Sequence, residues 1–204
     1  MIKINLCAVS AMLLGLISPL QAAEPKVDLA RAEQIVAGRC YLCHGPEGES
    51  ASPIYPRLAG QHWEYIAKQL AEFKNGKRKS DTMKSQVEEL TPDEMTALGV
   101  FFEKKKTTAR AARDAELVAV GKYVFNRGNS FSGVPACASC HGAKGHGTPQ
   151  LPRLAGQHPR YLEDQLKQFN SRERNNDNAV MHTVASKLSE LERNAVSEYI
   201  ATLD

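Results

Sequence analysis

The sequence of 204 residues contains no apolar run long enough to cross a bilayer comfortably. Its most apolar stretch, residues 6–17, follows Lys3 and is followed by Pro19 and the small-residue segment Gln21-Ala22-Ala23. A short positive region, an apolar run and a small-residue site are typical of a secretory signal peptide. We therefore predict that residues 1–23 form a signal peptide. The pattern is compatible with cleavage near its end and with retention as an anchor.

The sequence is also poor in cysteine and in net charge. Of its five cysteines, Cys7 lies in the predicted signal peptide and the other four lie in two pentapeptides, so no pair is left for a disulfide. The net charge is +3, with basic residues scattered among acidic ones, which is too small to indicate nucleic-acid binding. An exported protein without a spare cysteine pair fits the bacterial periplasm, and we predict no nucleic-acid partner.

The two pentapeptides share the pattern C-x-x-C-H, at residues 40–44 and again at residues 137–141. This pattern is the attachment signature of a c-type haem. Two thiols three residues apart can reach both vinyl groups of one porphyrin, and the next histidine can offer a nitrogen to the iron. We predict two covalently bound haem c groups. The predicted anchors are Cys40, Cys43, Cys137 and Cys140, and the predicted proximal iron ligands are His44 and His141.

Two other uses of C-x-x-C pairs explain the sequence less well. A dithiol redox pair usually begins a helix after a strand, and the sequence shows no strand pattern. A structural zinc site could use two such pairs, but it would leave the histidine after each second cysteine without a role. Because that histidine occurs twice, the sequence favours haem.

An internal repeat divides the sequence into two similar halves. The segment Pro56–His62 recurs unchanged as Pro152–His158, and a tyrosine, a Gln-Leu pair and a phenylalanine follow at the same offset. Each half contains one pentapeptide, so the sequence indicates a duplicated haem domain. We predict an all-α fold of two tandem haem domains, residues 24–103 and 114–204, joined by a charged linker at residues 104–113.

Helical periodicity and capping signals place helices in both halves. We expect an opening helix at about residues 28–38 and another from Asp114, the latter followed by an extra loop at residues 126–135 that is rich in Gly, Ser and Asn. The segments T-P-D-E at residues 91–94 and S-E-L-E at residues 189–192 are typical capping boxes, so each is predicted to begin the last helix of its half.

Few methionines are available to bind iron on the side opposite the histidine. After residue 23 only Met83, Met95 and Met181 remain. Met83 and Met181 each lie seven residues before a Leu-Thr or Leu-Ser pair, in segments predicted to be polar loops, whereas Met95 lies on the apolar side of a helix. A thioether ligand closes the site and produces an electron carrier. We predict Met83 and Met181 as axial ligands and Met95 as core packing. The competing histidines are His62, His146, His158 and His182. His62 and His158 recur where a helix is expected to begin, so we predict that they cap that helix or contact the haem edge.

Taken together, the two C-x-x-C-H halves, the P-R-L-A-G-Q segments, the Y-x-x-x-Q-L helices and the methionines before L-[ST] resemble the dihaem cytochrome c4 family. The resemblance covers essentially the whole chain after residue 23. It implies two tandem cytochrome c-like folds in a periplasmic protein that is loosely attached to the inner membrane in many members. It further implies a carrier, not an enzyme, without a small-molecule substrate, that passes electrons from a quinol-oxidising cytochrome complex to a terminal oxidase.

The resemblance also implies roles for residues around the haem. The carbonyls of Pro56 and Pro152 would accept the second ring N–H of the proximal histidines. Leucines 58 and 154 would pack on the haem faces, and Arg57 and Arg153 would contact propionates. Two alternatives stay open on the residues alone, namely a cytochrome subunit of a larger dehydrogenase and a dihaem peroxidase.

Overall fold

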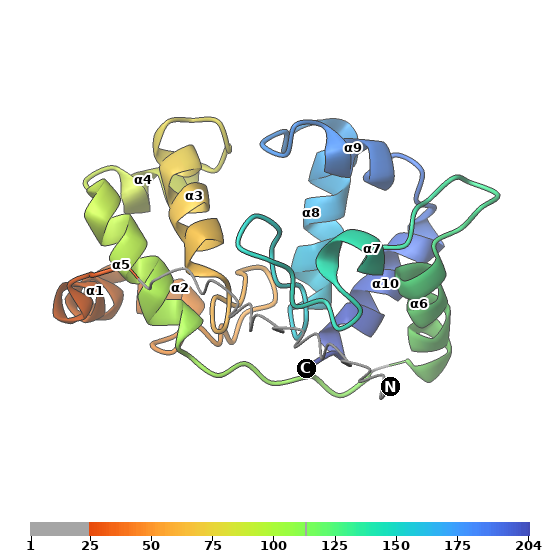
Figure 1. Ribbon diagram of the computed structural model, residues 1–204, viewed down its shortest axis with the longest axis horizontal. Coiled ribbons are helices and arrows are strands. Elements are labelled where there is room, and N and C mark those ends of the chain that lie inside the picture. The colour runs from red at the N-terminus through yellow and green to blue at the C-terminus, as the bar shows by residue number, and fades with distance from the viewer. Residues whose placement is uncertain (1–24, 113) are drawn as a thin grey trace, which may run out of the picture.

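The computed structural model describes residues 25–112 and 114–204, so the predicted signal peptide lies outside the described residues. Two helical lobes lie side by side in Figure 1, lobe one formed by residues 25–103 and lobe two by residues 114–204. Across these described ranges the only β-type pairing is an isolated bridge between Asn129 and Val134, which confirms the all-α prediction. None of the described helices is both long enough and apolar enough to span a membrane.

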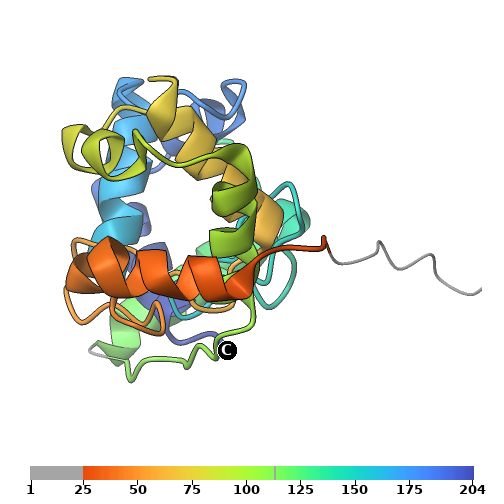
Figure 2. The ribbon, with the colours of Figure 1, turned by 90° about the vertical axis from the view of Figure 1, so that its left-hand side faces the viewer.

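Lobe one is built around its last helix. Its helical segments are α1 (Leu29–Ile35), the π-helical turn Val36–Cys40, α2 (Tyr41–His44), α3 (Trp63–Lys74), α4 (Asp81–Val87) and α5 (Pro92–Glu103). The carboxylate of Asp28 begins α1 by accepting the N–H of Arg31 at 2.9 Å. The chain then stays helical through the first pentapeptide, past the predicted end at residue 38. α5 packs against both α1 and α3, and α1 runs below α3 and α4 in the end-on view of Figure 2.

Lobe two repeats this plan with a longer opening helix. Its helices are α6 (Ala115–Arg127), α7 (Ala138–His141), α8 (Pro159–Ser171), α9 (Val180–Ala185) and α10 (Glu190–Ala201). α10 packs against α6 and α8. At Gly121 a Cβ would overlap the carbonyl of Ala195, so glycine lets α6 approach α10 closely. The extra loop predicted at residues 126–135 begins at Gly128, because α6 extends to Arg127.

Each lobe has its own apolar core, and the last helix of each lobe, α5 or α10, contributes to it. The predicted capping boxes begin these two helices. Thr91 accepts the N–H of Glu94 at 3.2 Å while the carboxylate of Glu94 accepts the N–H of Thr91 at 2.9 Å, and Ser189 and Glu192 make the same pair of bonds. Both predicted boxes are therefore confirmed. The largest buried side chains include Phe102 and Leu98 in lobe one and Phe125 and Val196 in lobe two.

The two methionine segments are short helices, and the prediction that they are polar loops was wrong. Ser80 accepts the N–H of Met83 at 3.3 Å and so begins α4 within a polar stretch. In lobe two the carboxylate of Asp177 accepts the N–H of Met181, and the two extra residues Asn178 and Ala179 adopt positive φ values of 55° and 66° before α9 starts. A side-chain cap therefore begins α4 but not α9, and the two segments differ in backbone conformation.

The segment of residues 104–112 connects the lobes along one side of the molecule without forming a helix (Figure 1). The N–H of Arg110 donates to the carbonyl of Ala201 at 2.8 Å, and the carbonyl of Thr108 accepts the guanidinium of Arg57 at 2.7 Å. The connection is therefore held against both lobes.

The contact between the lobes is polar and nearly two-fold symmetric. Arg78 and Arg174 are both buried, and each guanidinium lies 4.5 Å from the ring centre of a phenylalanine in its own lobe. Each also donates to the glutamine of its own lobe and to a glutamine and a tyrosine of the other. The bonds are Arg78 to Gln69 (2.7 Å), Gln165 (2.8 Å) and Tyr161 (2.9 Å), and Arg174 to Gln165 (2.6 Å), Gln69 (3.2 Å) and Tyr65 (2.8 Å).

One carboxylate breaks the symmetry of this contact. Glu72 is buried, and its oxygens lie 2.9 Å and 3.2 Å from the ammonium groups of Lys68 and Lys77. It also accepts the side-chain amide of Asn176 in lobe two at 2.5 Å. The equivalent position of lobe two is occupied by the neutral Gln168. Lobe one therefore contributes a buried negative charge to the contact that lobe two does not.

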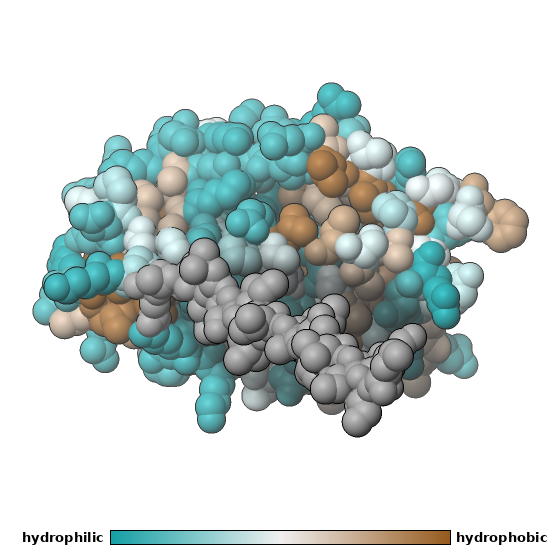
Figure 3. All heavy atoms as spheres, viewed as in Figure 1, coloured by the Kyte–Doolittle hydropathy of each residue, from teal (hydrophilic) through white to brown (hydrophobic). Residues whose placement is uncertain are grey.

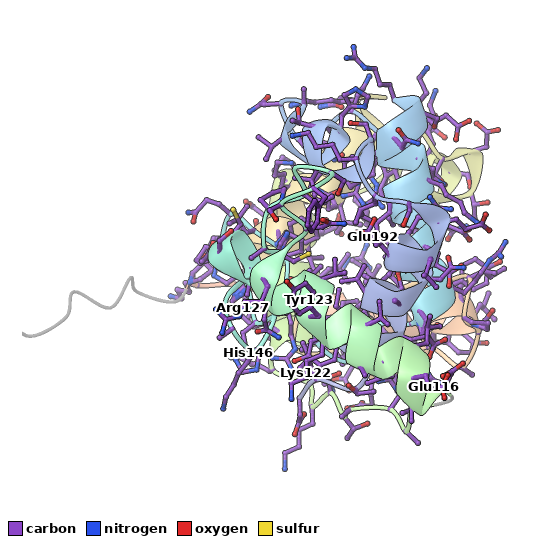
Figure 4. The ribbon with its side chains drawn as sticks, turned by 90° about the vertical axis from the view of Figure 1, so that its right-hand side faces the viewer. Glu116, Lys122, Tyr123, Arg127, His146 and Glu192 are labelled. Carbon is purple, nitrogen blue, oxygen red and sulfur yellow. The ribbon has the colours of Figure 1, made fainter. Side chains whose placement is uncertain are left out.

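The exposed surface is mostly hydrophilic, and in the view of Figure 3 the apolar side chains gather mainly over lobe two. Phe131, at the tip of the extra loop, is fully exposed. A groove of about 650 Å³ runs along the outer side of α6, lined by Lys122, Tyr123 and Arg127 among others (Figure 4). It contains none of the pentapeptide residues, so we place no haem there.

Candidate haem sites

Each pentapeptide lies on a short helix that faces the core of its own lobe. Cys40 and Cys137 pack against the cores of lobes one and two, and none of the four motif cysteines forms a disulfide with another described residue. Burial raises the pKa of the Cys40 thiol, and it raises the pKa of Cys137 to about 11. A reactive dithiol needs a cysteine with a lowered pKa, so Cys40 and Cys137 do not have the environment of the attacking cysteine of a redox pair.

The zinc alternative requires the thiols to be gathered in one place. The two pentapeptides belong to separate lobes, and within residues 25–112 and 114–204 no three His, Cys, Asp or Glu side chains are grouped so that they could hold a metal ion. A tetrahedral zinc site needs four ligands around one ion. The geometry therefore does not match a structural zinc site.

The two motif histidines are buried in equivalent ways. His44 and His141 are each 7% exposed, and their Nδ1 atoms donate to the carbonyls of Pro56 at 2.9 Å and Pro152 at 3.1 Å. A carbonyl can only accept, so Nδ1 carries the proton and Nε2 presents its lone pair. Burial lowers the pKa of both rings, which keeps them neutral, and in the described part of the chain their hydrogen bonds involve Nδ1 only. This is the contact that the resemblance implied.

The three methionines occupy different environments. Met83 is half-buried on α4 and packs against the core of lobe one, beside which Cys40 and Leu58 also lie. Met181 is half-buried on α9. Leu154, the counterpart of Leu58, packs against the core of lobe two. Met95 is 4% exposed within the core, which confirms its predicted packing role.

The competing histidines are engaged elsewhere. His62 and His158 begin α3 and α8 as expected, yet neither side chain caps its helix. The Nε2 atom of His62 donates to the carbonyl of His146 at 2.9 Å, and that of His158 donates to the carbonyl of Ser50 at 2.9 Å, so both rings bridge the lobes. His182 donates from Nδ1 to the carbonyl of Phe169 at 3.0 Å and accepts Arg172 at Nε2. Of the two roles expected for the repeated histidines, helix capping was wrong.

The repeated arginines differ between the lobes. Arg57 donates to three carbonyls, those of Glu49, Thr108 and Gly156, at 3.0, 2.7 and 2.9 Å, so the structure uses it to join the lobes. Arg153 has a buried Nε without a hydrogen-bond partner among the described residues. A buried, unsatisfied guanidinium donor fits an anionic acceptor such as a haem propionate. Arg153 therefore matches the role implied for it better than Arg57 does.

Sequence reasoning missed the cross-lobe role of the glutamines in the repeated segments. Gln61 and Gln157 are each 7% exposed and donate to the backbone of the opposite lobe. A signal was present, because an unchanged polar Gln-His pair before each helix is hard to explain by capping alone. The partner of each glutamine lies about a hundred residues away, and only the folded arrangement identifies it.

The sites fit a covalently attached haem in both lobes: paired thiols, a neutral buried imidazole beside them and a half-buried thioether on a short helix of the same lobe. A family model described as Cytochrome c matches the chain twice, over residues 29–127 and 118–204. A cytochrome c4 of Thiocapsa roseopersicina is 41% identical over 188 residues, covering 90% of this chain and 97% of that relative. The crystal structure of reduced recombinant cytochrome c4 from Pseudomonas stutzeri matches with a TM-score of 0.83 at 33% identity, covering 88% of this chain and 100% of that one.

A third relative carries a more specific description. A thiosulfate dehydrogenase electron acceptor of Stutzerimonas stutzeri (strain A1501) is 34% identical over 204 residues, covering 97% of this chain and 94% of that protein. The cytochrome c4 relatives are electron-transfer proteins rather than enzymes, which argues against the peroxidase alternative. Two tandem cytochrome c domains bind two covalently attached haem c groups with their irons. This chain belongs to the cytochrome c4 family of dihaem electron carriers.

Proposed function

We propose that each lobe holds one haem with a closed pair of axial ligands. In lobe one Cys40 and Cys43 are the anchors and His44 and Met83 the ligands. When bound, each haem supplies a one-electron iron couple whose potential a methionine ligand raises. The main support is the bond from each proximal imidazole to a proline carbonyl, which orients the ring and directs Nε2 away from the protein backbone. The equivalent residues of lobe two are Cys137, Cys140, His141 and Met181.

An absorption spectrum of the purified holoprotein tests this ligand set. We expect two haems per chain, a methionine-to-iron band in the oxidised form and no spectral change when carbon monoxide is added to the reduced form. The variants Met83→Ala and Met181→Ala should each open one iron to carbon monoxide, so half of the haem responds. Met95→Leu is the matched control, because Met95 lies in the core and its replacement should leave both irons closed. Ready carbon monoxide binding by the unaltered protein would contradict the proposal.

We further propose that the protein is exported through residues 1–23 to the periplasm, with haem domains bounded at residues 103 and 114. There it carries electrons from a quinol-oxidising cytochrome complex to a terminal oxidase. The likeness to cytochromes c4 along nearly the whole chain supports this role. One relative is described as an electron acceptor of thiosulfate dehydrogenase, which makes that enzyme the second candidate donor.

The two donors can be distinguished by mixing the oxidised protein with each purified donor and its substrate. Rapid reduction by the quinol-oxidising complex, followed by oxidation on addition of the oxidase, is the expected result. If only thiosulfate dehydrogenase reduces the protein rapidly, the second candidate replaces the first.

A further inference from the structure

Two buried glutamines, Gln61 and Gln157, cross from one lobe to the backbone of the other. Gln157 accepts the N–H of Arg57 at 2.9 Å and donates to the carbonyl of the same residue at 3.0 Å. Gln61 accepts the N–H of Arg153 at 2.8 Å and donates to its carbonyl at 2.8 Å. Each glutamine amide therefore pairs with one residue of the opposite lobe through both its oxygen and its nitrogen.

The orientation of both amides follows from their partners. The oxygen of Gln157 faces a second backbone donor, the N–H of His158 at 3.0 Å, and the oxygen of Gln61 faces the N–H of His62 at 3.2 Å. Backbone N–H groups cannot accept, so the side-chain oxygen must be the atom that faces them. The direction of the two cross-lobe pairs is thereby fixed.

The peptide group that each glutamine binds is also the peptide group that binds a proximal histidine. In lobe one the carbonyl of Pro56 accepts the ring N–H of His44, and the nitrogen of that same peptide belongs to Arg57, whose N–H donates to Gln157. In lobe two the peptide between Pro152 and Arg153 joins His141 to Gln61 in the same way. A single polarisable group therefore separates each glutamine from the imidazole of the opposite lobe.

Hydrogen bonds that share a peptide group strengthen one another. An acceptor on the N–H side draws electron density toward the carbonyl oxygen, which then accepts more strongly, by roughly 10–30% per bond. A stronger acceptor on the ring N–H makes the imidazole a more basic ligand, and a more basic ligand favours ferric over ferrous iron. Removing the glutamine should therefore weaken the ring N–H bond and raise the reduction potential.

We propose that the two glutamines tune the haems crosswise, so that Gln157 of lobe two sets the basicity of His44 and Gln61 of lobe one sets that of His141. Both are positioning residues that act through a peptide group and do not touch iron. The inference deepens the proposed function, since it rests on His44 and His141 as the iron ligands. Each lobe would then determine part of the potential of the other.

The test uses the reduced holoprotein and the variants Gln157→Leu and Gln61→Leu, which remove both bonds but retain an apolar side chain of similar size. NMR detects the ring Nδ1–H of His44 and His141 separately. We expect Gln157→Leu to shift the His44 resonance upfield and leave that of His141 in place, with the reverse for Gln61→Leu. When the two resonances are followed at set potentials, the ferrous-to-ferric ratio of the affected haem should rise about threefold. This equals a rise in its reduction potential of about 28 mV, at 59 mV per tenfold change in the ratio.

A second substitution and a control separate tuning from loss of structure. Gln157→Asn stays polar but is too short to span the same gap, so it should reproduce the shift at His44 if the leucine variant folds poorly. Gln69→Leu weakens the lobe contact at Arg78 and Arg174 and leaves both proline–arginine peptides bonded, so it should not move either ring resonance. Shifts of both histidines in every glutamine variant, or a shift confined to the lobe that carries the substitution, would overturn crosswise tuning.

Failure of the ligand set gives a different result. If the unaltered protein lacks the ring-current-shifted resonance of an iron-bound imidazole at His44 or His141, the ligand proposal fails and the tuning fails with it. If both imidazoles are iron-bound and the variants shift neither resonance, only the tuning is overturned.

Discussion

Tyr65→Phe removes a single hydroxyl from the contact between the lobes. That hydroxyl accepts the guanidinium of Arg174 at 2.8 Å, and among the described residues the same guanidinium nitrogen then retains only the oxygen of Gln69, at 3.2 Å. Arg174 is 7% exposed, so water cannot replace the lost acceptor freely. The substitution therefore weakens a buried, charge-assisted bond and leaves the ring of residue 65 in place.

The expected cost follows from the type of bond. A hydrogen bond to a charged group contributes about 1.5–3 kcal/mol to stability. We expect the free energy of unfolding to fall by about that amount, and Tyr161→Phe should cost a similar amount because its hydroxyl accepts Arg78 at 2.9 Å. A domain of this size has about 5–15 kcal/mol of stability in total, so the loss is measurable.

Urea unfolding provides the assay. The single tryptophan, Trp63, reports on lobe one by fluorescence, while far-UV circular dichroism reports on the helices of both lobes. A double-mutant cycle of Tyr65→Phe with Arg174→Met isolates the bond between them. Tyr123→Phe is the matched control, because Tyr123 is 65% exposed on the outer side of α6 (Figure 4) and should change stability by less than about 0.5 kcal/mol.

The reasoning has a clear point of failure. Independent sites add within about 0.3–0.5 kcal/mol. A coupling energy inside that range would refute the claim that Tyr65 and Arg174 stabilise the contact together, and so would equal costs for Tyr65→Phe and Tyr123→Phe.

Three further substitutions test other features of the fold. Gly121→Ala should cost about 1–3 kcal/mol in thermal unfolding, because its Cβ would overlap the backbone of α10. Ala179→Gly should stabilise lobe two by about 1 kcal/mol in urea unfolding, because φ at this residue is 66° and glycine adopts this conformation without strain. An unchanged stability would show that the backbone at Ala179 is not strained. Burial alone would raise the pKa of Glu72, but hydrogen bonds from neighbouring lysine and asparagine side chains outweigh it and lower the pKa below 4.5. The carboxylate therefore stabilises the protein above about pH 4.5 and loses this effect as the pH falls through the folded pKa. The loss of unfolding free energy between pH 7 and pH 3 should accordingly be smaller in Glu72→Gln than in the unaltered protein.

The sequence alone predicted those features of the fold that depend on short residue spacings or on the internal repeat. The pentapeptides, the capping box at Thr91 and Glu94 and the packing of Met95 all involve residues that are close in sequence or placed by helical periodicity. The repeat also indicated which methionines to compare. These features are local, and local chemistry determines them.

What the sequence did not reveal depends on tertiary contacts. The segments that contain Met83 and Met181 were predicted to be loops from their polar composition, whereas they form helices that pack against α3 and α8. His158 was interpreted as a helix cap, although its ring bonds to Ser50 in the other lobe. Bonds between residues so far apart have no signature in spacing.

The symmetry of the lobe contact bears on how such a molecule could arise. Arg78 binds Tyr161 as Arg174 binds Tyr65, so the contact has the form of an isologous interface in which one surface pairs with a second copy of itself. A single lobe of this kind would be complementary to its own twin and could form a homodimer. Joining two copies by a short connecting segment replaces concentration-dependent pairing with a permanent one. Once the copies are joined, each can diverge, as the buried Glu72 opposite a neutral Gln168 already illustrates.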